Sequence, residues 1–199
     1  MYFFEKSKKA LQKIRKIIFS PKVLYKTNYR KWADAGKTWG ANNPWRAKET
    51  ASLIIDGSSV LDIGAGSLIL KKYLPEKCKY IPCDIIDRGN DCIVCDLNKD
   101  SFPDIHCDYI TFIGVLEYIL DPFKAIKDAI NNCEYLIFTY NFLEDKDKIF
   151  EREQLGWISH ITMDETIKFL DNLNSITYNK LKINQGTEAW FMINAKKKK

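Results

Sequence analysis

Residues 59–66 read SVLDIGAG, a short apolar run that ends in two glycines. The run Ser59–Ile63 predicts a buried strand, because it is almost wholly apolar and too short for a typical helix. Gly64 and Gly66 follow it directly, and glycine lets the main chain turn sharply and lie against a ligand. A helix is predicted to follow, through Leu74. A strand, a glycine turn and a helix in this order are typical of nucleotide sites in α/β proteins.

Short apolar runs alternate with helix-like patterns over most of the remaining chain. Strands that are apolar along their whole length are typical of a parallel sheet covered by helices on both faces. A hairpin near the end of the chain is expected to add antiparallel strands at one edge. Strands are predicted at Tyr80–Cys83, Cys92–Cys95, Tyr109–Ile113 and Tyr135–Tyr140, helices at Arg46–Ile55, Asp121–Asn131 and Asp164–Leu173, and the hairpin at Ser175–Ile183 with Glu188–Ala195.

The composition is that of an ordinary globular protein. The 199 residues are 46% hydrophobic and 29% charged, which suits one domain and excludes a disordered chain. No run of about 18 apolar residues is free of charge, so no membrane span is predicted. The net charge of +5 is uneven: residues 1–31 carry +9 and Lys196–Lys199 carry +4, which leaves the body at −8. An acidic body argues against a nucleic-acid partner.

Three parts are predicted along the chain. Residues 1–45 form a basic N-terminal helix, at Ser7–Phe19, followed by an aromatic, lid-like extension. Residues 46–195 form the α/β domain, and residues 196–199 form a lysine tail. The basic helix is expected to pack on the domain, or to lie on a membrane surface or a partner protein.

The cysteines indicate a reducing compartment. The chain holds 6 of them and opens with only four apolar residues before its first charged residues, so no secretory leader is predicted. Reduced thiols in the cytoplasm are the default expectation for such a chain. Cys92 and Cys95 have a spacing that occurs in zinc sites, but no second pair of Cys or His follows at a matching distance. We therefore expect no metal site.

Acidic residues close the second and third predicted strands. Asp84 ends YIPCD, twenty positions after Gly64, where a carboxylate can accept the hydroxyl protons of a ribose. Asp96 ends IVCD, where it can accept a hydrogen bond from an adenine amine while the main chain of Leu97 faces a ring nitrogen. These two acids fit either NAD or another adenosine ligand. The dinucleotide fingerprint GxGxxG has Ile69 in place of its third glycine, which disfavours NAD.

Together these motifs resemble those of a class I S-adenosylmethionine-dependent methyltransferase. They are LDIGAG, the acid Asp84, CDLN at residues 95–98 and GVLEYILDP at residues 114–122. The resemblance covers Ser59–Tyr140 clearly, and it implies a Rossmann-like α/β sandwich with a mostly parallel seven-stranded sheet and S-adenosylmethionine as cofactor. By position, the resemblance implies which residues contact each part of the cofactor. The methionine part is lined by Asp62, Gly64, Ala65 and Gly66, the ribose by Asp84 and Ile85, and the adenine by Asp96 and Leu97. The segment Gly114, Val115 and Leu116 passes beneath the cofactor.

The segment IGVLEYI, at the end of the fourth predicted strand, indicates which class of acceptor to expect. Enzymes of this fold that methylate base amino groups often carry Asn/Asp-Pro-Pro-Tyr/Phe there. This segment more closely resembles methyltransferases that act on small molecules or glycans, which implies an oxygen or nitrogen atom as acceptor. Leu68 departs from the family pattern, because many relatives have a further glycine there, and this leaves the conformation of the glycine loop open.

An alcohol or ammonium acceptor must lose a proton during methyl transfer. His160 is the leading candidate for the base, since the chain has only 2 histidines and this one precedes a predicted helix. Glu117 follows the fourth predicted strand and Tyr140 ends the fifth, so both are expected to line the acceptor pocket. Aromatic walls for that pocket are expected from Trp157 and from the group Trp32, Trp39 and Trp45.

Two alternatives stay open on the sequence alone. A nicotinamide-dependent oxidoreductase can be built on the same kind of sheet. A non-catalytic, methyltransferase-like subunit can use its basic N-terminal helix to dock a partner protein.

Overall fold

The computed structural model describes residues 27, 29–35, 44–89, 91–144, 148–183 and 188–195. The predicted helix Ser7–Phe19 and the lysine tail lie outside these residues. Within the part of the chain that is described, no helix combines the length and the apolar character needed to cross a membrane.

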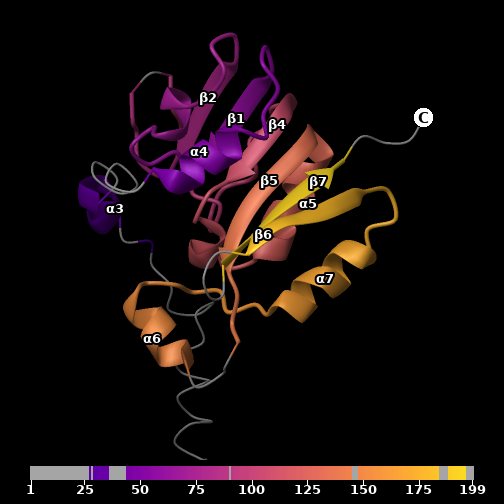
Figure 1. The fold of residues 1–199 in the computed structure, drawn as a ribbon. Coiled ribbons are helices and arrows are strands. Elements are labelled where there is room, and N and C mark those ends of the chain that lie inside the picture. Colours follow the sequence, from indigo (N-terminus) through magenta and orange to yellow (C-terminus); the bar gives the residue numbers. More distant parts are fainter. Residues whose placement is uncertain are drawn as a thin grey trace, which may run out of the picture.

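A seven-stranded sheet forms the centre of the fold, in the order β3-β2-β1-β4-β5-β7-β6. Strands β3 to β5 of this order run parallel, and β7 and β6 continue it antiparallel beyond β5 (Figure 1). The predicted, mostly parallel sheet with a C-terminal antiparallel hairpin is confirmed. The strands are β1 (Ser59–Ile63), β2 (Lys79–Asp84), β3 (Ile93–Val94), β4 (Cys107–Phe112), β5 (Cys133–Asn141), β6 (Thr177–Ile183) and β7 (Glu188–Asn194).

Two apolar clusters cover the two faces of the sheet. Val60 and Tyr109 are buried in one cluster, which includes residues of helix α4. Leu61 and Ile110 are buried in the other, which includes residues of α5 and α7. Successive strand residues point to opposite faces, so each strand contributes to both clusters. The predicted helices on both faces are thereby confirmed, with α4 at Trp45–Ala51, α5 at Pro122–Asn132 and α7 at Met163–Asp171.

Two helices begin where the sequence predicted. The Asp121 side chain accepts a hydrogen bond of 3.0 Å from the amide of Lys124 and caps α5. Thr162 caps α7 in a capping box with Glu165, in which each side chain bonds the main-chain N–H of the other residue. Such caps satisfy N–H groups that have no partner within the helix.

The predicted helix between the glycine turn and Leu74 is wrong. The chain there forms turns and the short 3-10 helix η1 (Leu70–Lys72). Leu68 has a φ of 57°, a left-handed conformation that a right-handed helix does not contain. Two helices were not predicted: α3 (Tyr29–Ala35), in the stretch expected to be a lid-like extension, and α6 (Ile149–Gln154).

The strand order reverses between β1 and β4. From β1 the chain builds outward through β2 and β3, and it then returns to add β4 and β5 on the opposite side of β1. Since these strands are parallel, they all end at the same edge of the sheet. At such a reversal the connecting segments diverge and leave a crevice for a ligand.

Candidate functional site

A cavity of about 420 Å³ lies at the carboxyl ends of β1 to β4. This volume is within the range of small-molecule sites. Leu116 is the one predicted cofactor residue outside its wall, because that side chain is fully buried in the core. The wall contains all the others: Asp62, Gly64, Ala65, Gly66, Asp84, Ile85, Asp96, Leu97, Gly114 and Val115.

The glycine turn after β1 is held by β2 and packed against the turn after β4. The amides of Gly64 and Ala65 both donate to the carbonyl of Cys83, at 2.7 and 3.0 Å. Gly64 has a φ of 75°, and the side chain of Val115 fills the space that a β-carbon there would need. Glycine is therefore required at position 64 by a close neighbour within the protein as well as by the turn itself.

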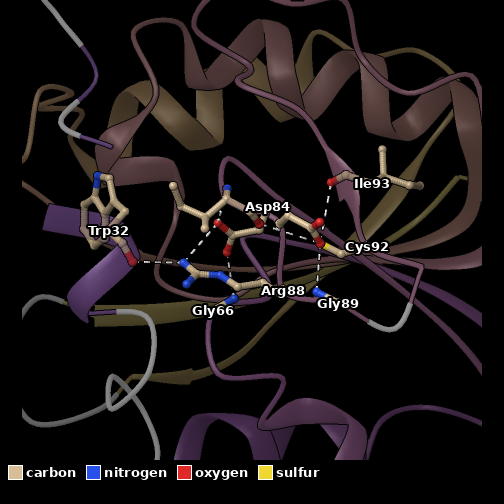
Figure 2. A network of polar contacts seen from close by, with 9 residues as sticks. Trp32, Gly66, Asp84, Arg88, Gly89, Cys92 and Ile93 are labelled. Carbon is tan, nitrogen blue, oxygen red and sulfur yellow. Dashed lines mark hydrogen bonds and ion pairs between the residues drawn. The ribbon is translucent and has the colours of Figure 1, made fainter. Parts of the chain in front are cut away.

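The Asp84 carboxylate, at the end of β2, is held by three donors (Figure 2). Its Oδ2 accepts a hydrogen bond of 2.8 Å from the amide of Gly66, and its Oδ1 accepts from the amide of Ile86 at 3.0 Å and from the guanidinium of Arg88 at 3.2 Å. The Arg88 side chain is almost completely buried, and it also donates to the carbonyl of Trp32 at 3.0 Å. Arg88 thus links the acid expected to bind ribose to helix α3.

The Asp96 carboxylate is buried and surrounded by donors from this chain. Its Oδ2 accepts from the hydroxyls of Thr27 and Tyr29, at 2.6 and 2.8 Å, and lies 3.1 Å from Nζ of Lys99. Its Oδ1 accepts from the amide of Asn98 at 3.1 Å. Burial raises the pKa of Asp96, but these hydrogen bonds outweigh it and hold the pKa below its ordinary value. Asp96 is therefore an ionised group that the N-terminal segment contacts directly.

Asp62, the acid before the glycine turn, is bound within the sheet. Its Oδ1 accepts from the hydroxyl of Thr111 and its Oδ2 from the hydroxyl of Tyr80, both at 2.7 Å. Burial raises the pKa of Asp62 to about 6, against the opposing effect of these two hydrogen bonds. The two carboxylate oxygens of Asp62 thus bind side chains of the neighbouring strands β4 and β2.

Aromatic residues form part of the cavity wall. Trp32 of α3 meets Tyr118 edge-on, with ring centroids 4.6 Å apart, and both line the cavity. The indole N–H of Trp157 donates to the hydroxyl of Tyr118 at 3.1 Å. Trp45 lines the cavity from α4, whereas Trp39 lies outside the described residues. The expected aromatic wall is therefore present for Trp32 and Trp45, with Trp157 supporting it from behind.

No protein-family model and no curated protein matches this chain. Solved structures do match it. A chain of the Haloferax volcanii complex between the Trm112 methyltransferase activator and a methyltransferase is similar over 84% of this chain and 95% of its own length, with 14% identity and a TM-score of 0.62. The plantazolicin methyltransferase BpumL in complex with SAH is similar over 91% of this chain and 98% of its own length, with 11% identity and a TM-score of 0.61. A SAM-dependent methyltransferase from Thermotoga maritima is similar over 83% of this chain and 99% of its own length, with 11% identity and a TM-score of 0.55. The chain has the class I methyltransferase fold.

In this methyltransferase fold, the residues predicted as catalytic lie behind the cavity wall. None of Glu117, Tyr140 and His160 is among the residues that line the cavity. The Glu117 carboxylate accepts from the amide and the side-chain nitrogen of Asn141, at 2.9 and 2.7 Å. The Tyr140 hydroxyl donates to the carbonyl of Ser159 at 2.8 Å. Glu117 and Tyr140 connect β4 and β5 to neighbouring segments and do not reach the cavity.

His160 belongs to a second polar group, formed around Arg152. Its Nδ1 accepts a hydrogen bond of 3.3 Å from Nε of Arg152. Burial and the nearby guanidinium lower the pKa of His160. The guanidinium of Arg152 is buried and donates to the carbonyls of Asn141 and Phe142, at 2.7 and 3.4 Å.

Arg46 and Arg88 line the cavity, and sequence reasoning missed both. The sequence gives little indication that either arginine belongs to the site. Arg46 lies before the first strand, Arg88 lies in a loop, and neither is part of a recognisable motif. Tyr118, in the short 3-10 helix η2 (Leu116–Tyr118) that follows β4, also lines the cavity. In each case the position depends on how distant segments pack against the edge of the sheet.

Proposed function

We propose that the chain is an S-adenosylmethionine-dependent methyltransferase and that the cavity is its cofactor site. The observation that supports this most directly is one cavity, at the reversal of the strand order, that brings the glycine turn together with Asp62, Asp84 and Asp96. The similarity in fold to BpumL, which is known in complex with SAH, agrees with this proposal. Under the proposal, residues 46–195 are the cofactor-binding domain.

The residues of the wall fit an adenosine ligand. A carboxylate has about four acceptor positions, and Asp84 uses three of them. The remaining position on Oδ2 is available to a ribose hydroxyl. Asp96 already has four donors around it, so an adenine amine has to replace one of them. We assign ribose binding to Asp84 and Ile85, adenine binding to Asp96 and Leu97, and the methionine part to the glycine turn.

The described part of the N-terminal segment is assigned the role of a lid. Thr27 and Trp32 line the cavity, and Tyr29 reaches Asp96 from the same segment. Arg88 joins the Trp32 carbonyl to the ribose acid. A lid excludes water from a reaction site and holds the ligand inside. Cofactor exchange in this protein then requires the segment to leave Asp96 and Arg88.

The cofactor supplies a methyl group on a positively charged sulfur. The chain contributes positioning: the main chain of the glycine turn and the acids Asp84 and Asp96 hold the ligand, while the aromatic wall keeps water out. Holding the two reacting groups in a productive geometry accounts for a large part of the rate in such displacements. This role needs no acidic or basic side chain at the methyl group itself.

Tyr118 is assigned to the acceptor side of the cavity. Its oxygen accepts the indole hydrogen of Trp157, and its own hydroxyl hydrogen has no acceptor among the described residues. Burial raises the pKa of Tyr118 to about 12, so the phenol stays protonated at neutral pH. A protonated phenol donates a hydrogen bond and orients an acceptor oxygen or nitrogen. The arrangement suits an amine with a free lone pair or an acidic hydroxyl.

We propose a small-molecule or glycan-related acceptor that is methylated on oxygen or nitrogen. The aromatic wall formed by Trp32, Trp45 and Tyr118 suits a compact acceptor with an apolar surface. The acidic body of the chain argues against nucleic acid. The cytoplasm is the proposed compartment, because all 6 cysteines are free thiols.

Calorimetric titration with SAH and, separately, with NADH tests the cofactor assignment. The wild type is expected to bind SAH and not NADH. Asp84→Asn is expected to weaken SAH binding at least tenfold, because the ribose loses a charged acceptor. Asp87→Asn is the matched control, since Asp87 lies three residues away, is exposed, and is not part of the cavity wall. Binding of NADH in place of SAH, or equal SAH affinity for Asp84→Asn and the wild type, would contradict the assignment.

A further inference from the structure

Two cysteines meet beside the acid assigned to adenine. Cys83 lies in β2, one residue before Asp84. Cys95 directly follows β3 and directly precedes Asp96. The two strands pair in parallel, with Cys83 opposite Ile93. Side chains two residues apart along an extended chain point to the same face, so Cys95 lies diagonally across from Cys83 on one face of the sheet.

The two sulfur atoms are in contact. Both side chains are buried in the same apolar cluster, and the Cys83 thiol donates a hydrogen bond to the Cys95 sulfur. This hydrogen bond holds the pKa of Cys95 below its ordinary value, against the effects of burial and of the nearby carboxylates of Asp100 and Asp96. The same contact, together with burial, raises the pKa of Cys83. Cys95 is therefore the sulfur that ionises first, and Cys83 keeps its proton.

The cavity gives access to Cys95. Among the described residues, Cys95 lines the cavity wall, whereas Cys83, which is 1% exposed, does not. Cys92, three residues before Cys95, is also outside the wall, and burial raises its pKa. A small solute that enters the cavity therefore meets Cys95 first. Redox-sensitive cysteines commonly combine ready ionisation, access for a solute and a second cysteine beside them.

We propose that Cys83 and Cys95 are an oxidation site, at which a peroxide that enters the cavity produces a disulfide that weakens cofactor binding. The second part of this proposal rests on the proposed function, and it assigns regulation to that site. In the reduced protein both cysteines are free thiols. A disulfide that forms and is reduced again is the usual kind in a reducing compartment.

The oxidation proceeds in two steps. The Cys95 thiolate attacks one peroxide oxygen, the O–O bond breaks, and hydroxide leaves and takes up the proton that Cys95 released. Cys95 is then a sulfenic acid. The Cys83 sulfur displaces the hydroxyl group of that acid, which leaves as water with the Cys83 proton. Two thiols are oxidised and one peroxide is reduced to two waters, and two equivalents of a reducing thiol reverse the change by exchange.

The disulfide disturbs the adenine end of the cavity. Two bonded sulfur atoms lie closer together than two thiols in contact, so Cys95 has to move toward β2. Such a movement is feasible because β3 lies at the edge of the sheet. Cys95 also loses its hydrogen bond of 3.6 Å to the carbonyl of Ser101, since the thiol proton is gone. Asp96 and Leu97 directly follow Cys95, so the groups assigned to adenine are displaced with it.

Peptide mapping tests the disulfide without any ligand. Trypsin cleaves after lysine and arginine, so it places Cys83 in residues 80–88 and Cys95 in residues 89–99. The full chain is treated with hydrogen peroxide, and the remaining thiols are blocked with N-ethylmaleimide. Mass spectrometry should then find the two peptides joined, and dithiothreitol should separate them.

Cys92 shares its tryptic peptide with Cys95, so variants have to distinguish the two. Cys92→Ser is the matched control and should still form the cross-link. Cys95→Ser should form none. Cys83→Ser should stop at the sulfenic acid of Cys95, which dimedone labels.

Calorimetry with SAH tests the effect on the cofactor site. We expect the cross-linked wild type to bind SAH about tenfold more weakly than the reduced protein, because a hydrogen bond to the charged Asp96 is disturbed. Dithiothreitol should restore the affinity. Cys95→Ser should bind SAH equally well before and after peroxide treatment. Excess SAH should also slow the cross-linking of the wild type, because the ligand covers Cys95.

Three results would overturn the inference. The first is a peroxide-treated wild type in which residues 80–88 and 89–99 are not joined. The second is a cross-link that persists in Cys95→Ser or is lost in Cys92→Ser. The third is a cross-linked wild type that binds SAH as tightly as the reduced protein. A reduced wild type that does not bind SAH would instead contradict the proposed function, and the peptide mapping, which needs no ligand, keeps the two failures distinguishable.

Discussion

The hydroxyl of Thr27 donates a hydrogen bond of 2.6 Å to the Asp96 carboxylate, across 69 positions of the chain. Tyr29 donates to the same oxygen at 2.8 Å. The acid that the sequence assigns to the adenine amine is thus already bound by the N-terminal segment. The segment and the adenine are expected to compete for one carboxylate oxygen.

Removing that competition should tighten cofactor binding. In the double variant Thr27→Val/Tyr29→Phe, we expect SAH affinity to rise about tenfold, since each hydrogen bond to a charged group contributes about 1.5–3 kcal/mol and part of this is regained by the remaining donors. Isothermal titration calorimetry measures the change. Tyr178→Phe is the control, because it removes a tyrosine–aspartate bond, to Asp171, on an exposed part of the hairpin. An unchanged or weaker affinity in the double variant would show that Thr27 and Tyr29 do not compete with the adenine for Asp96.

The glycine turn should tolerate no side chain at position 64. Gly64→Ala combines a left-handed φ with overlap against Val115, and we expect a loss of about 2–5 kcal/mol in the free energy of unfolding. Gly89→Ala has a similar φ of 70° with open space around the β-carbon, so it should lose only about 1 kcal/mol. Urea unfolding of both variants measures the difference. Equal losses would mean that the contact with Val115 has no energetic consequence.

The buried Asp62 should make stability depend on pH. Its pKa is raised to about 6, so the folded protein holds its proton more tightly than the unfolded chain does. The resulting stabilisation is complete below about pH 4 and is lost as the pH rises through about 6, on the order of 3 kcal/mol in total. Asp62→Asn should remove this dependence, with Thr111 and Tyr80 still bonded to the amide. Urea unfolding between pH 4 and pH 8 measures this pH dependence of the unfolding free energy, with Asp87→Asn as the control.

An unchanged pH profile in Asp62→Asn would contradict the assignment of the titration to that carboxyl. A profile that changes equally in Asp87→Asn would do the same, since Asp87 is exposed. The comparison needs no ligand, so its outcome is independent of the proposed function.

Arg152 should be needed for stability and not for catalysis. Its buried guanidinium binds main-chain carbonyls at both ends of the segment that joins β5 to α7, at Asn141 and Phe142 and, more weakly at 3.5 Å, at Ser159. Arg152→Met leaves these acceptors unpaired, and we expect a loss of about 2–4 kcal/mol in unfolding free energy. Thermal unfolding measures it, and SAH affinity of the folded fraction should be unchanged. The exposed Arg30→Met is the control.

The residues at this edge of the sheet were predictable because each lies near the end of a strand or just after it. Apolar runs locate the ends of the strands, and parallel strands bring their carboxyl ends to one edge, so Asp62, Asp84 and Asp96 had to meet there. The helix through Leu74 failed for a local reason, since nothing in the pattern signals that Leu68 adopts a left-handed conformation.

The remaining parts of the site depend on contacts between distant segments. Arg46 meets Glu188 across 142 positions, and Lys31 meets the carbonyl of Leu155 across 124. No sequence pattern in either segment indicates which distant segment it contacts. The same reason applies to Glu117 and Tyr140, which were expected to line the acceptor pocket. Glu117 follows β4 and Tyr140 lies near the end of β5, but their side chains bind Asn141 and Ser159, and neither residue is in the cavity wall.

The segment joining β5 to α7 has its two ends fastened together by Arg152, and it carries Trp157 to Tyr118. A loop closed at its base in this way can gain or lose residues at little free-energy cost, because closure entropy grows slowly with length. Evolution can therefore alter this segment, which contacts the cavity wall only from behind, through Trp157 and Tyr118, while the sheet and the strand ends around the cavity are inherited unchanged. Under the proposed function, the range of acceptors should diverge first in this segment among descendants of this protein.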